Sequence, residues 1–314
     1  MKKTAILFPG QGSQYVGMGA PFLDDVEAAE LLERAEKISG YPLVRLTQEG
    51  PLEELTRGIH LQPALTAINL ICWQQLQKRL PGFKPVCSAG HSLGEYSALF
   101  CAGVFAEDDA LRLVTRRGEL MEREGTARPG GMHAVLGLDI ATIERLLNEY
   151  EGEGVVVVAN HNTPQQIVIS GDEKGLEGLG ALCREEGGKC IPLPVSLANH
   201  SPLVAGAVED FRSFIDTVEV HPPALPVFFN ITASTEQRPD EIRRIMAEQV
   251  VSRVRWVDSI AAMVDAGVEI FVELGPKSVL TGMMKKLLPR KSGIVCLQAD
   301  TPDAMDRVAR AIAA

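Results

Sequence analysis

Residues 86–100 read Val-Cys-Ser-Ala-Gly-His-Ser-Leu-Gly-Glu-Tyr-Ser-Ala-Leu-Phe. The start of this stretch has the length and apolar character of a buried strand, and its end favours a helix. Between them, Gly90, Ser92 and Gly94 form the pattern G-x-S-x-G, whose glycines allow a tight turn that lifts the serine hydroxyl above the sheet. The stretch therefore predicts a strand, a turn and a helix, with Ser92 as candidate nucleophile. A turn that serves only the fold is the alternative.

Strands and helices alternate on both sides of this stretch. An apolar run at 4–8 is closed by Pro9-Gly10, which fits a buried strand of a parallel sheet. Helical patterns follow at 26–37, 63–80, 204–218, 239–250 and 257–266, with strand-like segments at 227–229 and 270–273. This order predicts an α/β domain, in which functional loops lie at the carboxyl ends of the parallel strands.

The pattern between Gly130 and Val195 is different. It predicts strands at 132–138, 155–159, 166–170 and 189–195, and helices at 140–150 and 173–186. The order β-α-β-β-α-β is that of a ferredoxin-like unit. We therefore predict a catalytic domain formed by residues 1–128 and 197–314, with residues 129–196 inserted as a ferredoxin-like subdomain.

Composition limits the possible functions. The chain has 314 residues, 46% of them hydrophobic and 23% charged, as expected of a globular protein. Lys and Arg total 31 against 41 Asp and Glu, and the resulting net charge of −10 argues against a nucleic-acid partner. No apolar run is long enough for a signal peptide or a membrane span, so we expect a cytoplasmic protein. The six cysteines have no metal-ligand spacing, so we expect small buried side chains and no metal site.

A serine nucleophile requires a base and a site for the oxyanion. Of the six histidines, His200 is the best candidate for the base because it lies on the loop that re-enters the large domain. A surface histidine that caps the next helix is the alternative. The loop around Gln11 offers backbone N–H groups at the end of a strand, and Leu93, which follows the serine, offers a second N–H. Nucleotide binding by this loop is weakly supported, because Tyr15 replaces the last glycine of the dinucleotide pattern.

Several motifs together resemble one enzyme family nearly from end to end. They are Phe8-Pro-Gly-Gln-Gly-Ser-Gln14, Gly90-His-Ser-Leu-Gly-Glu-Tyr-Ser97, Arg117-Gly118, Asn160-His-Asn-Thr-Pro-Gln165, Ala198-Asn-His-Ser-Pro202 and Glu273-Leu-Gly-Pro276. The combination is similar to the malonyl-CoA:acyl carrier protein transacylases of bacterial fatty acid synthesis. The resemblance implies an α/β-hydrolase-like domain with a ferredoxin-like insert, in agreement with the element order above.

The resemblance also implies catalytic roles. Ser92 would be the nucleophile and His200 its base, with the N–H groups of Gln11 and Leu93 holding the oxyanion. In this family a backbone carbonyl orients the histidine, and the matching residue is Gln249. The implied machinery is a Ser-His dyad.

Two further residues would bind the substrate if the resemblance holds. Arg117 would bind the free malonyl carboxylate through a bidentate pair, which a lysine could not reproduce. On its own, Arg117 reads as a solvated helix residue. Gln62 matches a further polar position that lines the site of the family.

The implied reaction is ping-pong transfer of a malonyl group from malonyl-CoA to the phosphopantetheine thiol of an acyl carrier protein, through a malonyl-serine. It requires no metal and no bound cofactor. Alternatives are an acyltransferase of polyketide or other extender-unit specificity, a serine esterase or thioesterase, and an inactive docking module. Residues 197–199 match neither the malonyl nor the methylmalonyl pattern of polyketide acyltransferases.

An acidic carrier protein would need a local basic patch on this acidic chain. The best candidate is Lys285 and Lys286 with Arg290 and Lys291, and a solvated helix end is the alternative. Arg253 and Arg255 form the next candidate.

Overall fold

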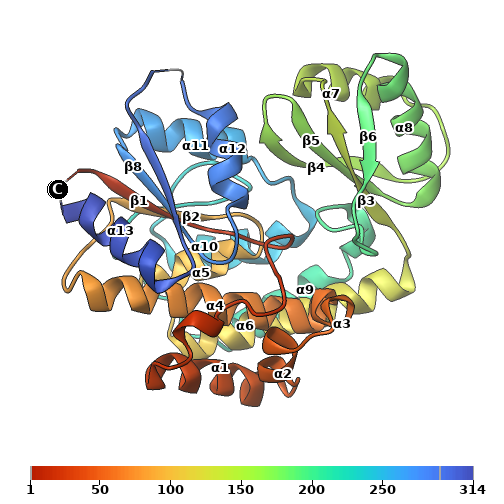
Figure 1. Cartoon of the computed structure of the whole chain (residues 1–314). Coiled ribbons are helices and arrows are strands. Elements are labelled where there is room, and N and C mark those ends of the chain that lie inside the picture. Colours follow the sequence, from red (N-terminus) through yellow and green to blue (C-terminus); the bar gives the residue numbers. More distant parts are fainter. Residues whose placement is uncertain (1, 290, 314) are drawn as a thin grey trace.

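The computed structural model describes residues 2–289 and 291–313, and it contains two separate sheets with helices packed around them (Figure 1). The larger sheet is parallel and has the order β7-β2-β1-β8-β9. Its strands are β1 (Thr4–Phe8), β2 (Cys87–Gly90), β7 (Val227–Phe228), β8 (Ile270–Leu274) and β9 (Val295–Ala299). The side chains of β1 are almost completely buried, as expected of a parallel sheet covered on both faces.

Helices cover the two faces of this sheet. Ile6 and Phe8 of β1 point into the larger core and Ala5 and Leu7 into the smaller one, following the two-residue period of a strand. The larger core is formed with α1 (Val26–Ser39), α4 (Gly58–Arg79), α5 (Gly94–Cys101), α6 (Glu107–Ala127), α9 (Ala207–Ile215), α10 (Pro239–Glu248) and α13 (Pro302–Ala313). The smaller core is formed with α11 (Trp256–Asp265) and α12 (Val279–Leu287).

The smaller sheet is antiparallel and has the order β4-β5-β3-β6. It consists of β3 (Gly131–Leu136), β4 (Val156–Thr163), β5 (Gln166–Gly171) and β6 (Lys189–Pro192), and α7 (Ile140–Glu149) and α8 (Glu173–Glu185) pack on it around a core of its own. This is the predicted β-α-β-β-α-β order, and the mixed α/β fold with a ferredoxin-like unit is confirmed. The domain boundaries at 128/129 and 196/197 stay a prediction.

The smaller sheet is hydrogen-bonded, through the middle of β4, to the segment that precedes α11. Val254 donates its N–H to the Ala159 carbonyl at 2.8 Å and accepts the N–H of His161 at 2.9 Å. Val254 lies just before α11, so β4 is hydrogen-bonded to the loop that leads into this helix, which packs on the parallel sheet. This connection brings the Asn160 segment over the parallel sheet.

Some elements differ from the sequence prediction. The predicted strand at 189–195 ends at Pro192, because Pro192 and Pro194 lack the N–H that a ladder needs. The predicted helix at 204–218 is divided by a turn at Ala205-Gly206. The division gives η2 (Pro202–Val204) and α9, and the helix at 239–250 changes to η3 (Gln249–Val251). Sequence patterns did not predict η1 (Ala20–Phe22), α2 (Leu43–Gln48), α3 (Leu52–Thr56), α6, α12, β9 or α13.

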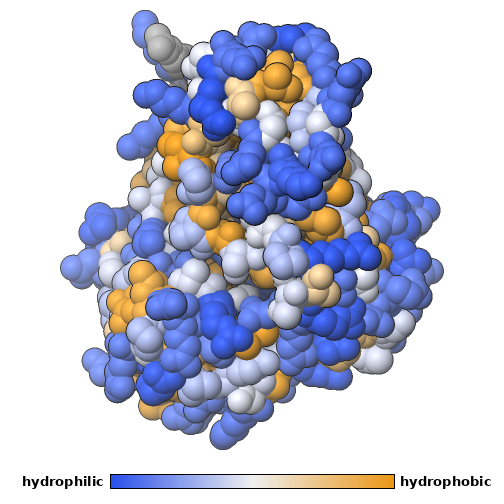
Figure 2. Space-filling model, turned by 90° about the vertical axis from the view of Figure 1, so that its right-hand side faces the viewer, coloured by the Kyte–Doolittle hydropathy of each residue, from blue (hydrophilic) through white to orange (hydrophobic). Residues whose placement is uncertain are grey.

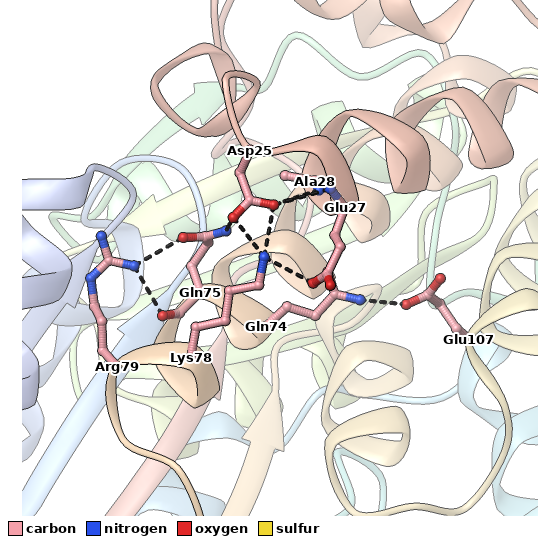
Figure 3. A network of polar contacts seen from close by, with 8 residues as sticks. All are labelled: Asp25, Glu27, Ala28, Gln74, Gln75, Lys78, Arg79 and Glu107. Atoms are coloured by element: carbon pink, nitrogen blue, oxygen red, sulfur yellow. Dashed lines mark hydrogen bonds and ion pairs between the residues drawn. The ribbon is translucent and has the colours of Figure 1, made fainter.

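The start of α1 is fixed by a polar network that connects it to α4 (Figure 3). Asp25 caps α1 by accepting the N–H groups of Glu27 and Ala28, and it also accepts from Gln75 and Lys78 of α4. The hydrogen bond from Lys78 is the main reason that the pKa of Asp25 falls to about 2. Asp25 thus caps the start of α1 and also holds α1 against α4.

The surface agrees with the composition. Figure 2 shows one face as mostly hydrophilic, with separate apolar patches rather than one continuous apolar area. Within the described residues, no helix combines the length and the apolar character needed to cross a membrane. The cysteines are free thiols: Cys72, Cys87 and Cys183 are buried as expected, while Cys101, Cys190 and Cys296 are half-buried.

Candidate active site

The turn between β2 and α5 holds Ser92 in a strained conformation. Its φ of 50° lies in the left-handed region, which costs a non-glycine residue on the order of 1–3 kcal/mol. The glycines on either side are required by close contacts. A Cβ at Gly90 would lie 1.9 Å from the Gly94 carbonyl, and a Cβ at Gly94 would lie 2.1 Å from the Phe8 carbonyl oxygen. The G-x-S-x-G pattern therefore reflects the space available where the turn crosses the end of β1.

Ser92 and His200 form a hydrogen-bonded pair. The distance from Ser92 Oγ to His200 Nε2 is 2.7 Å, and His200 Nδ1 lies 2.9 Å from the Gln249 carbonyl oxygen. Because a carbonyl can only accept, the proton sits on Nδ1, and Nε2 is free to accept the serine proton. This geometry provides a nucleophile and a base without a carboxylate.

The pKa of His200 is lowered to about 3, chiefly by burial and then by the positive charge of Arg117. Its bond to the Gln249 carbonyl acts in the opposite direction. The imidazole is thus neutral around pH 7, which is the form that can act as a base. The left-handed φ of 58° at His200 places a second strained residue in the site.

Arg117 brings a buried positive charge next to the serine. It is only 2% exposed, which corrects the reading of this residue, taken alone, as a solvated helix position. Its Nη1 donates to Gln62 Oε1 at 2.8 Å, and its Nη2 donates to Gln249 Oε1 at 3.1 Å and to Ser92 Oγ at 3.4 Å. Burial lowers the pKa of Arg117, and the nearby Tyr96 and Glu95 raise it. Among the described residues, no carboxylate forms an ion pair with Arg117.

Two backbone N–H groups are free to hold an oxyanion. The loop at Gly10 packs directly on the turn, since a Cβ at Gly10 would lie 2.3 Å from the His91 carbonyl oxygen. Within residues 2–289 and 291–313, the N–H groups of Gln11 and Leu93 have no acceptor. The N–H of Ser92 is used, because it donates to Asn230 Oδ1 at 2.6 Å. Gln11 and Leu93 are therefore the available pair.

The cavity above Ser92 lies between the two sheets. Its polar lining includes Gln11, Ser92, Asn160, Asn162, Asn199 and His200, and its apolar lining includes Met132, Val168, Leu193, Val195, Leu280 and Met283. The Oδ1 atoms of Asn160 and Asn199 are buried without a partner in the described part of the chain. A cavity with an apolar wall and free acceptors suits a long thin arm that carries amide groups.

His91, the residue before the nucleophile, points away from the Ser92 hydroxyl. His91 Nε2 lies 2.7 Å from Asn162 Oδ1, and the ring packs edge-on against Trp256 at 5.4 Å. Burial lowers the pKa of His91. This side chain therefore connects β4 to the turn and does not contact the serine hydroxyl.

The structure brings the predicted site residues together from distant parts of the sequence: Gln11, Gln62, Ser92, Leu93, Arg117, His200 and Gln249. Two buried residues in contact with them, Glu95 and Asn230, were not predicted. Glu95 directly follows the G-x-S-x-G pattern and could have been noticed. Asn230 carries no signal of its own in the sequence.

The structure describes three of the four residues of the predicted basic patch. Lys285 and Lys286 are exposed at the end of α12, whose first turns line the cavity, and Lys291 is also exposed. Arg290 lies outside the described residues. The second candidate is less available, because Arg253 pairs with Glu144 and Arg255 pairs with Asp258.

Comparisons with known proteins agree on one family. Residues 6–309 match the family model described as acyl transferase domain. A malonyl CoA-acyl carrier protein transacylase from Haemophilus influenzae is 39% identical over 92% of this chain and 93% of its own. The crystal structure of an acyl carrier protein S-malonyltransferase from Vibrio cholerae superposes with a TM-score of 0.91, at 36% identity over 98% of this chain and 99% of that one. A malonyl-transacylase in complex with a type II polyketide acyl carrier protein superposes with a TM-score of 0.93, at 33% identity over 98% of this chain and 99% of that one.

Proposed function

The chain belongs to the acyl transferase family, among the malonyl CoA-acyl carrier protein transacylases, and on this premise we propose that it transfers malonyl groups from malonyl-CoA to an acyl carrier protein. The observation that carries the proposal is the pairing of Ser92 with His200 beside the guanidinium of Arg117. A nucleophile and a base perform acyl transfer. A buried cation without a carboxylate partner suits an acyl group that carries its own carboxylate.

In the first half-reaction, Ser92 Oγ attacks the thioester carbonyl of malonyl-CoA while His200 Nε2 accepts the hydroxyl proton. The N–H groups of Gln11 and Leu93 stabilise the oxyanion of the tetrahedral intermediate. The intermediate collapses, the carbon–sulfur bond breaks, and the coenzyme A thiol leaves with the proton from His200. The malonyl group is then an ester of Ser92, with its carboxylate held by Arg117.

In the second half-reaction, the phosphopantetheine thiol of the carrier protein enters the same cavity. His200 accepts the thiol proton, and the sulfur attacks the serine ester at the same oxyanion site. When the intermediate collapses, the proton returns to Ser92 Oγ and the malonyl thioester leaves on the carrier protein. Coenzyme A and the carrier protein present the same pantetheine arm, so one cavity serves both steps.

An acyl carrier protein is the second substrate in this proposal. Support comes from the similar malonyl-transacylase whose structure contains a carrier protein. The exposed Lys285 and Lys286 lie at the end of a helix that lines the cavity, where an acidic partner could dock while its arm reaches Ser92. We also propose a cytoplasmic location, which agrees with the free thiols of the cysteines.

The domain division of the sequence prediction becomes part of this proposal. Residues 129–196 would be an inserted subdomain, and residues 1–128 and 197–314 would form the catalytic domain. The separate hydrophobic core under the antiparallel sheet supports this division. The substrate cavity would then lie between the two units.

A two-stage transfer assay tests the function. The protein is mixed with malonyl-CoA, excess malonyl-CoA is removed, and phosphopantetheinylated carrier protein is added while the masses of both proteins are followed. We expect one malonyl group to appear on the enzyme and then to move to the carrier protein. Release of free malonate in the first stage, without transfer in the second, would instead indicate a thioesterase.

A further inference from the structure

Asn230 closes the turn that carries the nucleophile. This fully buried residue follows β7, far from the turn in the sequence. Its Oδ1 accepts the N–H of Ser92 at 2.6 Å, and its Nδ2 donates to the Gly90 carbonyl at 2.7 Å. One side chain thus binds the backbone on both sides of His91. Strained residues persist only where their surroundings hold them, and these two bonds supply that restraint at Ser92.

Glu95 connects this turn to the residues that surround it. The side chain lies in the first turn of α5 and is fully buried. One carboxylate oxygen accepts the backbone N–H of Asn230 at 2.6 Å, and the other accepts Gln249 Nε2 at 3.0 Å. Burial raises the pKa of Glu95 to about 8, while the Asn230 N–H, the charge of Arg117 and the Gln249 amide act in the opposite direction. Because both oxygens receive donors, the geometry favours the carboxylate, and a glutamine at position 95 would direct an NH2 group at one of the two donors.

Gln249 extends the network to the base and the cation. Its Nε2 also donates to the Ser92 carbonyl at 2.9 Å, its Oε1 accepts from Arg117, and its backbone carbonyl accepts from His200. The amide of Gln249 lies between the Glu95 carboxylate and the Arg117 guanidinium. Glu95 therefore reaches Arg117 only through this amide and forms no direct ion pair that would block the guanidinium.

We propose that Glu95 and Asn230 are positioning residues of the acyl transfer: Asn230 fixes the strained Ser92 turn, and Glu95, through Gln249, aligns Arg117 and His200 with it. This inference rests on the proposed function for the identity of the substrates. The two residues do not contact the substrate in this account. Asn230 acts on the Ser92 turn, Glu95 acts on Gln249, and the Asn230 N–H joins the two by its hydrogen bond to Glu95.

The two positions should leave different kinetic signatures. Asn230→Ala releases the turn and should lower Ser92 acylation at least tenfold for malonyl-CoA and acetyl-CoA alike. Glu95→Gln releases the Gln249 side chain that holds Arg117. We expect it to lower malonyl transfer at least tenfold and to lower the malonyl-to-acetyl preference several-fold.

The control variant is Ser88→Ala. Ser88 is buried on β2 and donates to the Ala98 carbonyl of α5 at 3.1 Å, so the variant loosens the same strand–helix pair without touching the network. We expect near wild-type rates and preference. Melting temperatures of all variants separate loss of fold from loss of positioning.

Two conservative variants keep the test decisive if the first ones fold poorly. Asn230→Asp retains an acceptor for the Ser92 N–H, and Glu95→Asp retains the charge on a shorter arm. We expect a partial recovery of rate in the first and of malonyl preference in the second. Folded variants at both positions that match Ser88→Ala in rate and preference would overturn the proposal.

A reagent that needs no malonyl group separates this proposal from the proposed function. Phenylmethylsulfonyl fluoride reacts with activated serines, and we expect Asn230→Ala to slow its reaction with Ser92 at least tenfold. If the wild-type protein reacts with the reagent but does not accept malonyl from malonyl-CoA, the substrate is wrong and the positioning role stands. If Asn230→Ala reacts as fast as wild type, the role of Asn230 is wrong.

Discussion

The network around Ser92 and the network around Asp25 use similar side chains but are completed in different ways. At the start of α1, Asp25 accepts from two backbone N–H groups, from Gln75 and from Lys78, so its charge is matched within the protein (Figure 3). Near Ser92, Arg117 has only amide and hydroxyl partners among the described residues. The first network satisfies itself, whereas the second leaves a cation for a partner from outside.

The pKa shifts express the same contrast. Asp25 has a lowered pKa mainly because Lys78 binds its carboxylate, so this group stabilises the fold above its ordinary pKa of 3.8 and loses that contribution as the pH falls toward 2. His200 has a lowered pKa mainly because burial disfavours its charged form. The unfolded chain binds that proton more readily, so His200 opposes folding as the pH falls from 6.5 toward 3. The paired charges around Asp25 therefore stabilise the fold. The burial that keeps His200 neutral destabilises the fold at low pH.

Removing the base should produce the largest loss of activity. We expect His200→Ala to slow acylation of Ser92 by roughly 100- to 10,000-fold, because an unactivated serine is a weak nucleophile. Rapid-quench measurement of the malonyl-enzyme checks this. His91→Ala is the matched control and should have a smaller effect. In the wild type, the acid limb of kcat/KM should lie well below pH 6.5, since burial lowers the pKa of His200. A larger effect of His91→Ala would mean that the wrong base was assigned.

Removing the positive charge of Arg117 should change which thioester the enzyme prefers. Arg117→Ala should lower malonyl transfer by the loss of a buried charge-assisted pair, about 2–5 kcal/mol, and improve the relative use of acetyl-CoA. The ratio of kcat/KM for the two thioesters is the measurement. Loss of the positive charge should also raise the pKa of His200 and shift the acid limb upward with acetyl-CoA. Equal losses for both substrates would show that Arg117 supports the fold only.

The exposed lysines at the end of α12 should affect the carrier protein alone. Reversal of Lys285 and Lys286 to Glu should raise the KM for carrier protein several-fold, with the largest difference at low salt. Loading from malonyl-CoA should stay nearly unchanged. The control is reversal of Arg253 and Arg255, whose charges already have partners. If loading and transfer fall together, or neither changes, the lysines are not the docking surface and the arginines are the next candidates.

Disruption of the network around Asp25 should reduce the stability of the fold and leave catalysis intact. Asp25→Ala removes a helix cap and should cost about 1–2 kcal/mol of unfolding free energy at pH 7, with unchanged malonyl transfer. Urea denaturation measures the difference, which should diminish as the pH falls from 3.8 toward 2. Glu153→Ala, in an exposed pair with Lys174, should change stability far less. A loss of activity in folded Asp25→Ala would contradict the separation of the two networks.

The sequence predicted the elements better than the contacts between them. The ferredoxin-like unit was predictable because its strands are short apolar segments, its helices are amphipathic, and the two follow one another in a recognisable order. The role of Arg117 was predictable only by resemblance. Its helix, α6, is rich in charged residues, and Arg117 itself is buried only because α6 packs against α4. Asn230 could not be predicted, since its role depends on the parallel pairing of β7 with β2. Local patterns determine helices and strands, while the fold decides which polar groups meet.

We propose that Ser92 carries the malonyl group, in a site that the malonyl carboxylate completes by pairing with Arg117. Intact-protein mass spectrometry after mixing with malonyl-CoA tests it most directly. We predict one malonyl group per wild-type chain, and none on folded Ser92→Ala, whose turn depends on Gly90 and Gly94 rather than on the hydroxyl. Malonylation of a Ser92→Ala variant to the same stoichiometry as wild type would show that another residue carries the malonyl group.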